Sequence, residues 1–228
     1  MDTIIKDSEI SDDTVKLYQC VQIVSSKISN NSVVGDFSRV TNSVMFGFNR
    51  IDRNSLIYNS KLGYCSYIGS NSKVLHSEIG KYCSIAWNVT IGPANHDYKK
   101  FTSHDFLYNT FYDILEKDED PIYNRFEKKT IIGNDVWIGA NSTILNGITV
   151  GDGAVIGANT IVTKNVPPYG IVVGNPGILI KFRFSSDIIS QLLKLKWWDL
   201  SKEVLKENFN IFKSNDIQKI INVLKERI

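Results

Sequence analysis

The side chains best suited to proton transfer in this chain are its histidines, His76, His96 and His104. An imidazole titrates close to physiological pH, so it can take a proton from an attacking alcohol or amine and later return it. His96 stands four residues after Gly92, where a regular repeat stops. His76 sits where that repeat changes phase, and we expect a corner or surface position for it.

The cysteines predict neither a metal site nor a disulfide framework. Cys20, Cys65 and Cys83 are odd in number and lack the Cys-x-x-Cys spacing of metal and redox sites. Cys83 occupies a repeat position that takes small packed side chains, so we expect it to be structural. No Ser-His-Asp grouping or activated cysteine is evident, and we expect no metal.

Composition and charge exclude several classes of function. The 228 residues are 43% hydrophobic, with 26 basic and 24 acidic side chains and a formal net charge of +2. This balance gives no electrostatic case for nucleic-acid binding. The N-terminus lacks a basic stretch followed by an apolar core, and no apolar run approaches the roughly 20 residues of a membrane span. We therefore expect a reduced, cytoplasmic protein without a membrane span.

The elements that position these residues are predicted by a six-residue repeat between residues 131 and 167. Successive units read IGNDVW, IGANST, ILNGIT, VGDGAV, IGANTI and VTKNVP. An aliphatic residue opens each unit, and its fifth position is small or β-branched. Neither a helix nor a single strand has this period, whereas a triangular solenoid with three units per turn does. We predict that the opening residue points inward and that Gly or Asn-Gly supplies positive φ at the corners.

The repeat begins earlier in a less regular form. Ile28, Val34 and Val40 are six residues apart, but the spacing shortens by one between Val74 and Ile79. This change of phase predicts a tightened corner.

Between residues 93 and 130 the period is lost for 38 residues. A break of that length inside a solenoid predicts an extruded loop, and long loops on rigid scaffolds usually carry function. We expect its many aromatic residues to pack against another surface, and a short helix at 108–115. These aromatic residues are Tyr98, Phe101, Phe106, Tyr108, Phe111, Tyr112, Tyr123 and Phe126.

The C-terminal part changes from strand to helix patterns. Residues 169–184 read as extended, whereas apolar spacing from Ser186 onward is helical, with a cap at Ser201 and a last helix over 217–224. We expect these helices to cover the open end of the solenoid. The predicted domains are 1–184, with the loop at 93–130, and a helical segment at 185–228.

Together these features resemble the hexapeptide-repeat acyltransferases, most closely the branch of xenobiotic (chloramphenicol and streptogramin) and related saccharide O-acetyltransferases. The resemblance covers roughly residues 60–184. It implies an all-β solenoid of the left-handed parallel β-helix type, acetyl-CoA as co-substrate, and a homotrimer with sites between neighbouring prisms. The motifs that carry it are Asn95-His96, Asn134-Asp-Val-Trp-Ile-Gly-Ala140, Gly157-Ala-Asn-Thr-Ile-Val-Thr-Lys164, Val166-Pro-Pro-Tyr169 and Gly174-Asn-Pro176.

The resemblance assigns His96 as general base. Asn95 is expected to orient the substrate or to brace the loop. His104 is expected either in the substrate pocket or in a hydrogen bond within the loop. Without a nucleophile of its own, the chain favours direct transfer in a ternary complex over a covalent acyl-enzyme.

For the cofactor, the resemblance assigns Ala140, Ala158, Thr163, Lys164 and Lys181. Small residues let the pantetheine arm lie close to the wall, and lysines suit its phosphates. The family often has a second basic residue three positions before Lys181. Here that position is Ile178, so phosphate binding would rest on the two lysines and Arg183. Trp137 is expected either to flank the cofactor or to serve a structural role at a corner.

The activity predicted first is acetyl-CoA-dependent O-acetylation of a sugar hydroxyl in a surface polysaccharide or its precursor. Antibiotic acetylation is the second hypothesis, although streptogramin-type enzymes have Asn-His-Arg-Met-Asp where this chain has Asn-His-Asp-Tyr-Lys at 95–99. N-acetylation of a nucleotide-linked amino sugar is a third. A hexapeptide scaffold, or a metal protein of the carbonic-anhydrase type, fits poorly because three scattered histidines make a poor ligand set.

Overall fold

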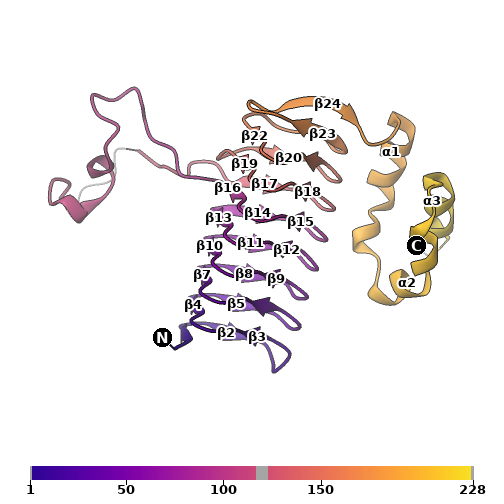
Figure 1. Cartoon of the computed structure of the whole chain (residues 1–228), viewed down its shortest axis with the longest axis horizontal. Helices are drawn as coiled ribbons and strands as arrows, with labels where there is room; N and C mark the ends of the chain where they lie inside the picture. The colour runs from indigo at the N-terminus through magenta and orange to yellow at the C-terminus, as the bar shows by residue number, and fades with distance from the viewer. Residues whose placement is uncertain (1, 117–122, 227–228) are drawn as a thin grey trace.

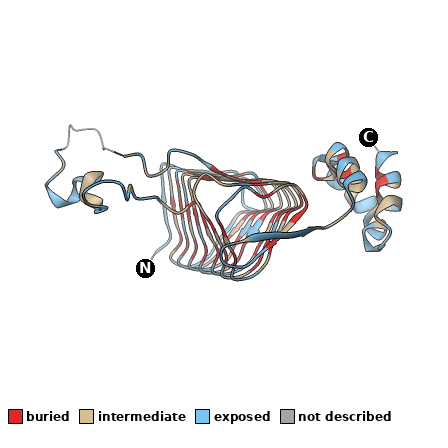
Figure 2. Cartoon of the chain, turned by 90° about the horizontal axis from the view of Figure 1, so that it is seen from above, coloured by how far each residue is buried: buried red, intermediate tan, exposed pale blue. Residues whose placement is uncertain are grey.

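The computed structural model describes residues 2–116 and 123–226. Within those ranges the strands form three sheets, A, B and C, which are the sides of a triangular prism (Figures 1 and 2). Each coil of the chain contributes one strand to each side, and strands of successive coils pair in parallel. The fold is the predicted left-handed parallel β-helix with an extruded loop and a C-terminal helical segment.

The strands are very short, because each chain segment must turn after a few residues to stay in the triangle. Sheet A contains β1 (Ile4–Lys6), β4 (Gln22–Val24), β7 (Arg39–Thr41), β10 (Leu56–Tyr58), β13 (Lys73–Leu75), β16 (Thr90–Ile91), β19 (Thr143–Ile144) and β22 (Ile161–Val162). Sheet B contains β2 (Glu9–Ile10), β5 (Lys27–Ile28), β8 (Val44–Met45), β11 (Lys61–Leu62), β14 (Ser77–Ile79), β17 (Thr130–Ile132) and β20 (Thr149–Val150). Sheet C contains β3 (Lys16–Leu17), β6 (Val33–Val34), β9 (Arg50–Ile51), β12 (Tyr67–Ile68), β15 (Ser84–Ile85), β18 (Trp137–Ile138), β21 (Val155–Ile156), β23 (Gly170–Val173) and β24 (Ile178–Phe182).

The core follows the hexapeptide pattern. The residues that open the repeat units are at most 2% exposed, which confirms that they point into the prism: Ile132, Ile138, Ile144, Val150, Ile156 and Val162. Small residues at the fifth position, such as Ser142 and Ala154, are also fully buried. Cys83 takes the same position, and burial raises the pKa of its thiol to about 12. Its role is therefore packing.

The corners between the sheets contain left-handed backbone, but most of it is not glycine. At the B–C corner the positive-φ residues include Phe48, Tyr82 and Tyr169, and at the C–A corner they are mainly asparagines. Gly139, in the second position of its unit, has no positive φ. A Cβ there would lie 2.6 Å from the Ala158 nitrogen of the next coil. The expectation that these glycines supply the bends was wrong: they permit close stacking of coils.

The A–B corner is the tightened corner that the phase change predicted. A single left-handed residue turns the chain in each early coil, and in the fifth coil it is His76, with φ of 47°. These early coils repeat every 17 residues, whereas later ones repeat every 18. The expected corner position of His76 is thus confirmed.

The extruded loop leaves the A–B corner after β16 and returns at β17, and it extends away from the prism (Figure 1). The helix expected at 108–115 is absent from this described stretch. It holds the 3₁₀ turn η2 (Thr110–Tyr112), which follows η1 (Asp105–Leu107), and left-handed Asp113 ends η2. Residues 117–122 of the predicted loop lie outside the described residues.

The C-terminal segment comprises α1 (Ser186–Leu195), η3 (Trp197–Asp199), α2 (Lys202–Glu207), η4 (Phe209–Lys213) and α3 (Ile217–Lys225). Ser201 caps α2 as predicted, by accepting a hydrogen bond from the Val204 N–H. Residues 227–228 lie outside the described residues. Whether 1–184 and 185–228 are separate domains stays a prediction.

The expectation that these helices cover the open end of the prism was wrong. They lie beside the B–C corner (Figure 2), where the Lys81 ammonium is 2.8 Å from the Asp199 carboxylate and Tyr82 contacts Trp197. That corner presents the aromatic ladder Phe48, Tyr64 and Tyr82, which offers apolar surface along the side of the prism. The hairpin of β23 and β24 extends sheet C beyond the last coil.

Across residues 2–116 and 123–226, no helix has the length and apolar character needed to cross a membrane. Nor does this part of the chain bring together three or more His, Cys, Asp or Glu side chains that could hold a metal ion.

Candidate active site

The two legs of the extruded loop are joined at its base through Asn95. The Asn95 N–H donates to the Arg125 carbonyl oxygen at 3.2 Å, and Arg125 Nε donates to the Asn95 carbonyl oxygen at 3.3 Å. The Asn95 side chain lines a polar hollow of about 280 Å³ with Tyr123 and Asn146. Asn95 therefore braces the loop through its backbone, which was one of its two expected roles.

His96 is held in one tautomer by its neighbours. Its Nδ1 lies 2.7 Å from the Ser103 carbonyl oxygen, which can only accept, so Nδ1 carries the hydrogen. The Tyr108 hydroxyl oxygen is 2.5 Å from the same nitrogen. Nε2 lies 3.1 Å from Arg125 Nη2, which can only donate. The lone pair on Nε2 thus points outward, as a general base requires.

Arg125 organises the side chains around His96. Its Nη1 donates to Asp105 Oδ1 at 2.8 Å, and its guanidinium lies 4.8 Å from the centre of the Tyr108 ring. Loss of solvent around the Tyr108 hydroxyl raises the pKa of this phenol, while the positive charge of Arg125 opposes the shift. The sequence interpretation missed Arg125. Its only sequence signal is that it is the single arginine between residues 93 and 130.

His104 makes the loop-internal hydrogen bond that was one of its two expected roles. It caps η1, with Nδ1 accepting from the Phe106 N–H at 3.1 Å. Its ring lies 4.8 Å from that of Tyr112 and is exposed at the loop surface. His76 is further down the A–B corner, stacked on Phe126.

The expected cofactor residues fall on two neighbouring corners. Ala140 and Ala158 stack in successive coils at the C–A corner, where the Asn159 N–H donates to the Ala140 carbonyl oxygen at 2.8 Å. Thr163 and Lys164 follow β22 at the A–B corner and are exposed. The loop of His96 leaves from this same corner, two coils below. Sheet A spans the distance between the two groups.

Lys181 is not brought near Lys164. It pairs with Ile171 on sheet C, in the hairpin, and is exposed. Arg183, expected to support phosphate binding, is instead at the B–C corner, where its Nη1 donates to Asp135 Oδ2 at 3.1 Å and to the Gly153 carbonyl oxygen at 2.7 Å. Trp137 lies within β18 on the outer face of sheet C, 55% exposed, and so is not at a corner.

Comparison with known proteins identifies the family. Residues 129–164 match the model of the hexapeptide repeat of succinyl-transferase. The chain is 43% identical over 153 residues to a probable macrolide acetyltransferase of Lysinibacillus sphaericus, covering 65% of this chain and 84% of that protein. The chain belongs to the hexapeptide-repeat acetyltransferases.

Another relative of this acetyltransferase is a chloramphenicol acetyltransferase of Klebsiella aerogenes, 40% identical over 148 residues, which are 61% of this chain and 67% of that protein. Among solved structures, a variant of the N-acyltransferase AntD from Bacillus cereus, in complex with dTDP-4-amino-4,6-dideoxyglucose and coenzyme A, has a TM-score of 0.52. It is 20% identical and covers 84% of this chain and 91% of its own, so it supports the fold alone.

Proposed function

We propose that this acetyltransferase transfers the acetyl group of acetyl-CoA to a hydroxyl of a sugar unit in a surface polysaccharide or its precursor, with His96 as general base. The observation that carries the proposal is the tautomer of His96. Nδ1–H is committed to the Ser103 carbonyl oxygen, and the Nε2 lone pair is available at the surface of the loop.

In the transfer step, acetyl-CoA supplies the thioester when bound. The acceptor O–H gives its proton to His96 Nε2 while its oxygen attacks the carbonyl carbon. The departing thiolate then takes the proton back from Nε2, so the imidazole ends as it began. Arg125 bonds to Nε2 in the present arrangement, so the acceptor hydroxyl has to displace its guanidinium. Ser103 and Tyr108 keep the ring oriented through Nδ1 during the exchange.

The wall of the prism suits the donor. Ala140 and Ala158 leave the backbone of the C–A corner accessible to an arm of amides, which can pair with N–H and C=O groups. Lys164, exposed at the corner that carries the loop, provides a positive charge for a phosphate. Lys181 would have to act at a different part of the cofactor, because it lies on sheet C.

The loop supports a trimer in which each site lies between two prisms. Phe111 is 83% exposed, and Tyr98 and Phe101 are at least as exposed, on a loop that extends away from its own prism. Such aromatic exposure is unusual unless another surface covers it. We expect a homotrimer in sedimentation; a stable monomer at working concentration would contradict this site model. The cytoplasmic location stays a prediction.

An antibiotic hydroxyl is a second candidate acceptor, because the relatives at 40–43% identity are named as macrolide and chloramphenicol acetyltransferases. The Asn-His-Asp-Tyr-Lys segment at 95–99 is the feature that separates this chain from the streptogramin-type pattern.

The deciding experiment is thiol release from acetyl-CoA across a panel of sugars, nucleotide-linked amino sugars, chloramphenicol and macrolides. Turnover with a sugar hydroxyl that exceeds turnover with every antibiotic supports the first acceptor class. Preference for an antibiotic establishes the second. If no acceptor releases thiol above the rate of hydrolysis, the proposal of an alcohol acceptor fails.

A further inference from the structure

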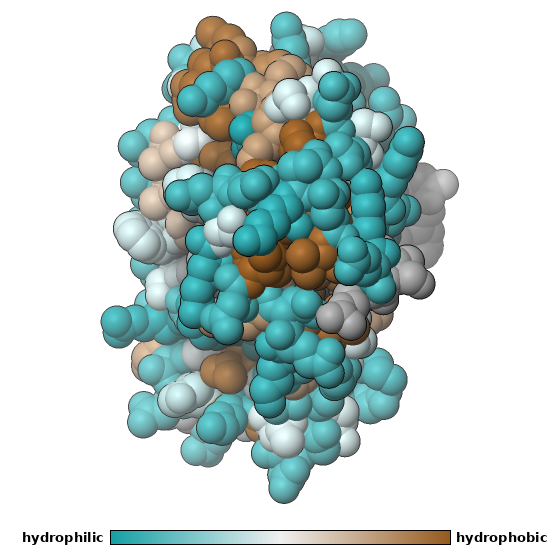
Figure 3. Space-filling view, turned by 90° about the vertical axis from the view of Figure 1, so that its right-hand side faces the viewer, coloured by the Kyte–Doolittle hydropathy of each residue, from teal (hydrophilic) through white to brown (hydrophobic). Residues whose placement is uncertain are grey.

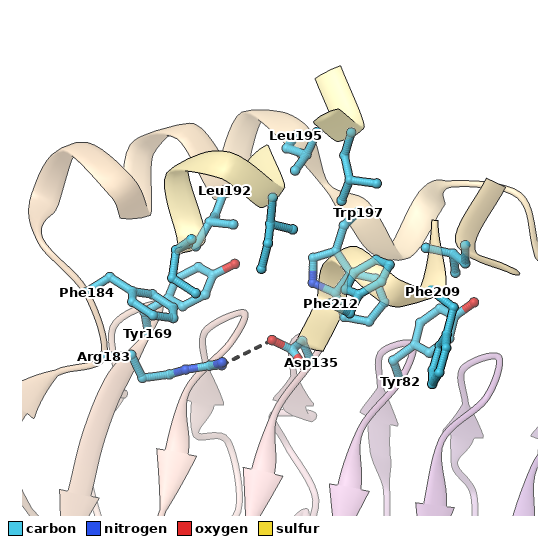
Figure 4. Close-up of a pocket in the computed structure, with 14 residues that line it drawn as sticks. Tyr82, Asp135, Tyr169, Arg183, Phe184, Leu192, Leu195, Trp197, Phe209 and Phe212 are labelled. Atoms are coloured by element: carbon cyan, nitrogen blue, oxygen red, sulfur yellow. Dashed lines mark hydrogen bonds and ion pairs between the residues drawn. The ribbon is translucent and has the colours of Figure 1, made fainter. Parts of the chain in front are cut away.

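A cavity of about 470 Å³ lies at the B–C corner, where the C-terminal helices face the prism (Figure 4). Tyr82 and Tyr169 bound it on the prism side, while Leu192, Trp197 and Phe212 bound it on the helical side. Small-molecule pockets usually measure about 300–1,000 Å³, so this cavity is of the right size. It is separate from the proposed transfer site, which uses the A–B and C–A corners.

The cavity is not the result of a loosely attached helical segment. Ile221 and Leu224 of α3 are at most 1% exposed and pack with α1 in a small core of their own. The ion pair of Lys81 with Asp199 and the contact of Tyr82 with Trp197 fix the segment to the prism. Protein interiors rarely contain voids larger than a water molecule. A recess of this size between two closed cores is therefore a shaped feature.

The walls of the cavity are almost entirely apolar. Apart from one ion pair, they consist of aromatic and aliphatic side chains contributed by both the prism and the helices. On the molecular face that carries the helices, apolar atoms are visible in a gap between hydrophilic side chains (Figure 3). Such a lining favours an apolar ligand body, because burial removes its surface from water.

One end of the cavity is polar and incompletely paired. Arg183 bridges Asp135 and the Gly153 carbonyl oxygen, so its charge is balanced locally. The Tyr169 hydroxyl is buried and has no hydrogen-bond partner among the described residues. It points into the space between Leu192 and Trp197 (Figure 4). A buried hydroxyl without a partner is costly, and an acceptor placed there by a ligand would satisfy it.

From this geometry we infer that the cavity is a binding site for a neutral, apolar small molecule of about two fused rings that carries one hydrogen-bond acceptor. The rings lie between Leu192, Trp197 and Phe212, and the acceptor takes the hydrogen bond of the Tyr169 hydroxyl. The balanced Asp135–Arg183 pair favours a neutral acceptor over an anion. A ligand bound there contacts both the prism and the helices, so it stabilises their association by mass action.

The test uses prodan, a neutral dimethylaminonaphthalene that carries a propionyl ketone, with the full-length protein. We expect one saturable site per chain, blue-shifted emission and energy transfer from tryptophan. Trp197→Phe should remove most of this transfer while retaining binding. The matched control Trp87→Phe, an exposed tryptophan at the C–A corner, should leave the transfer intact. Transfer lost only in Trp87→Phe, or absent saturation in the wild type, overturns the site.

A double comparison tests the acceptor. Tyr169→Phe should weaken prodan binding about fivefold, the effect of one hydrogen bond, and should not weaken binding of dimethylaminonaphthalene that lacks the ketone. Equal weakening of both probes would overturn the assigned role of the hydroxyl. Leu192→Phe, which fills the cavity, should abolish the binding of both. If that variant does not fold, competition between prodan and unlabelled naphthalene for the wild-type site replaces it, and failure to compete overturns the proposal.

Discussion

The A–B and B–C corners of the same prism are built in opposite ways. At the A–B corner the chain leaves the prism in a loop whose side chains pair through hydrogen bonds, as in the network of His96, Arg125 and Asp105. At the B–C corner it is covered by helices over an aromatic ladder, with Leu192 and Trp197 facing Tyr82 and Tyr169. The comparison indicates that the first corner is arranged for chemistry and the second for apolar contact. Substitutions should therefore separate turnover from stability.

The largest effect is expected from His96→Ala. Turnover at saturating acceptor should fall by about 10²–10⁴-fold, since the general base is lost. Coenzyme A affinity and the melting temperature should be unchanged, because His96 is exposed on the loop. His104→Ala should raise the KM of the acceptor instead, as its ring lies at the loop surface. Steady-state kinetics of both variants check this; normal kcat in His96→Ala with reduced kcat in His104→Ala would move the base to His104.

Leu224→Ala tests the other corner. Leu224 is 1% exposed in the helical core, and truncating such a side chain costs about 2–5 kcal/mol of unfolding free energy. Urea unfolding followed by circular dichroism measures the loss. Leu179→Ala, at a 41% exposed position of β24, is the matched control and should cost much less. If Leu224→Ala lowered kcat in proportion to its effect on stability, the two corners would not be independent.

Lys164→Ala should weaken coenzyme A binding by about 1.5–3 kcal/mol, the range for a hydrogen bond to a charged group, without changing kcat. Calorimetric titration of coenzyme A measures this directly. Lys181→Ala, made alongside, reports whether the lysine on sheet C also contacts the cofactor. Unchanged affinity in Lys164→Ala would show that it is a solvated surface charge.

The smallest effect concerns Asp135 beneath the helical segment. Burial raises the pKa of this carboxyl above its ordinary value of 3.8, although the charge of Arg183 opposes the shift. The folded state therefore binds the proton more tightly than the unfolded state. The contribution of Asp135 to stability is greatest at acid pH and declines as pH rises through its raised pKa. Asn at this position cannot titrate. The unfolding free energy of wild type relative to Asp135→Asn should fall from about pH 4 towards pH 7; a rise would contradict the shift.

The six-residue period alone determined the architecture of the prism. An aliphatic residue every six positions can be buried only where the chain turns after each short strand, so Ile132, Ile138 and Ile144 specified three sides without further information. The shortened spacing before Ile79 likewise predicted the tight corner at His76. The interruption after Gly92 located the extruded loop, and with it the candidate residues Asn95 and His96.

Only the tertiary structure decided which residues surround His96 and where the helices lie. Arg125 is 29 residues away from His96 in the chain, and no local pattern indicates that the returning leg of the loop places it at Nε2. The helical periodicity after Ser186 predicted an apolar face but not its partner. That partner is the column of Phe48, Tyr64 and Tyr82, which are 16–18 residues apart and become one surface only when the coils stack. Local periodicity fixes which face is buried, whereas contacts between distant segments depend on how the finished prism brings them together.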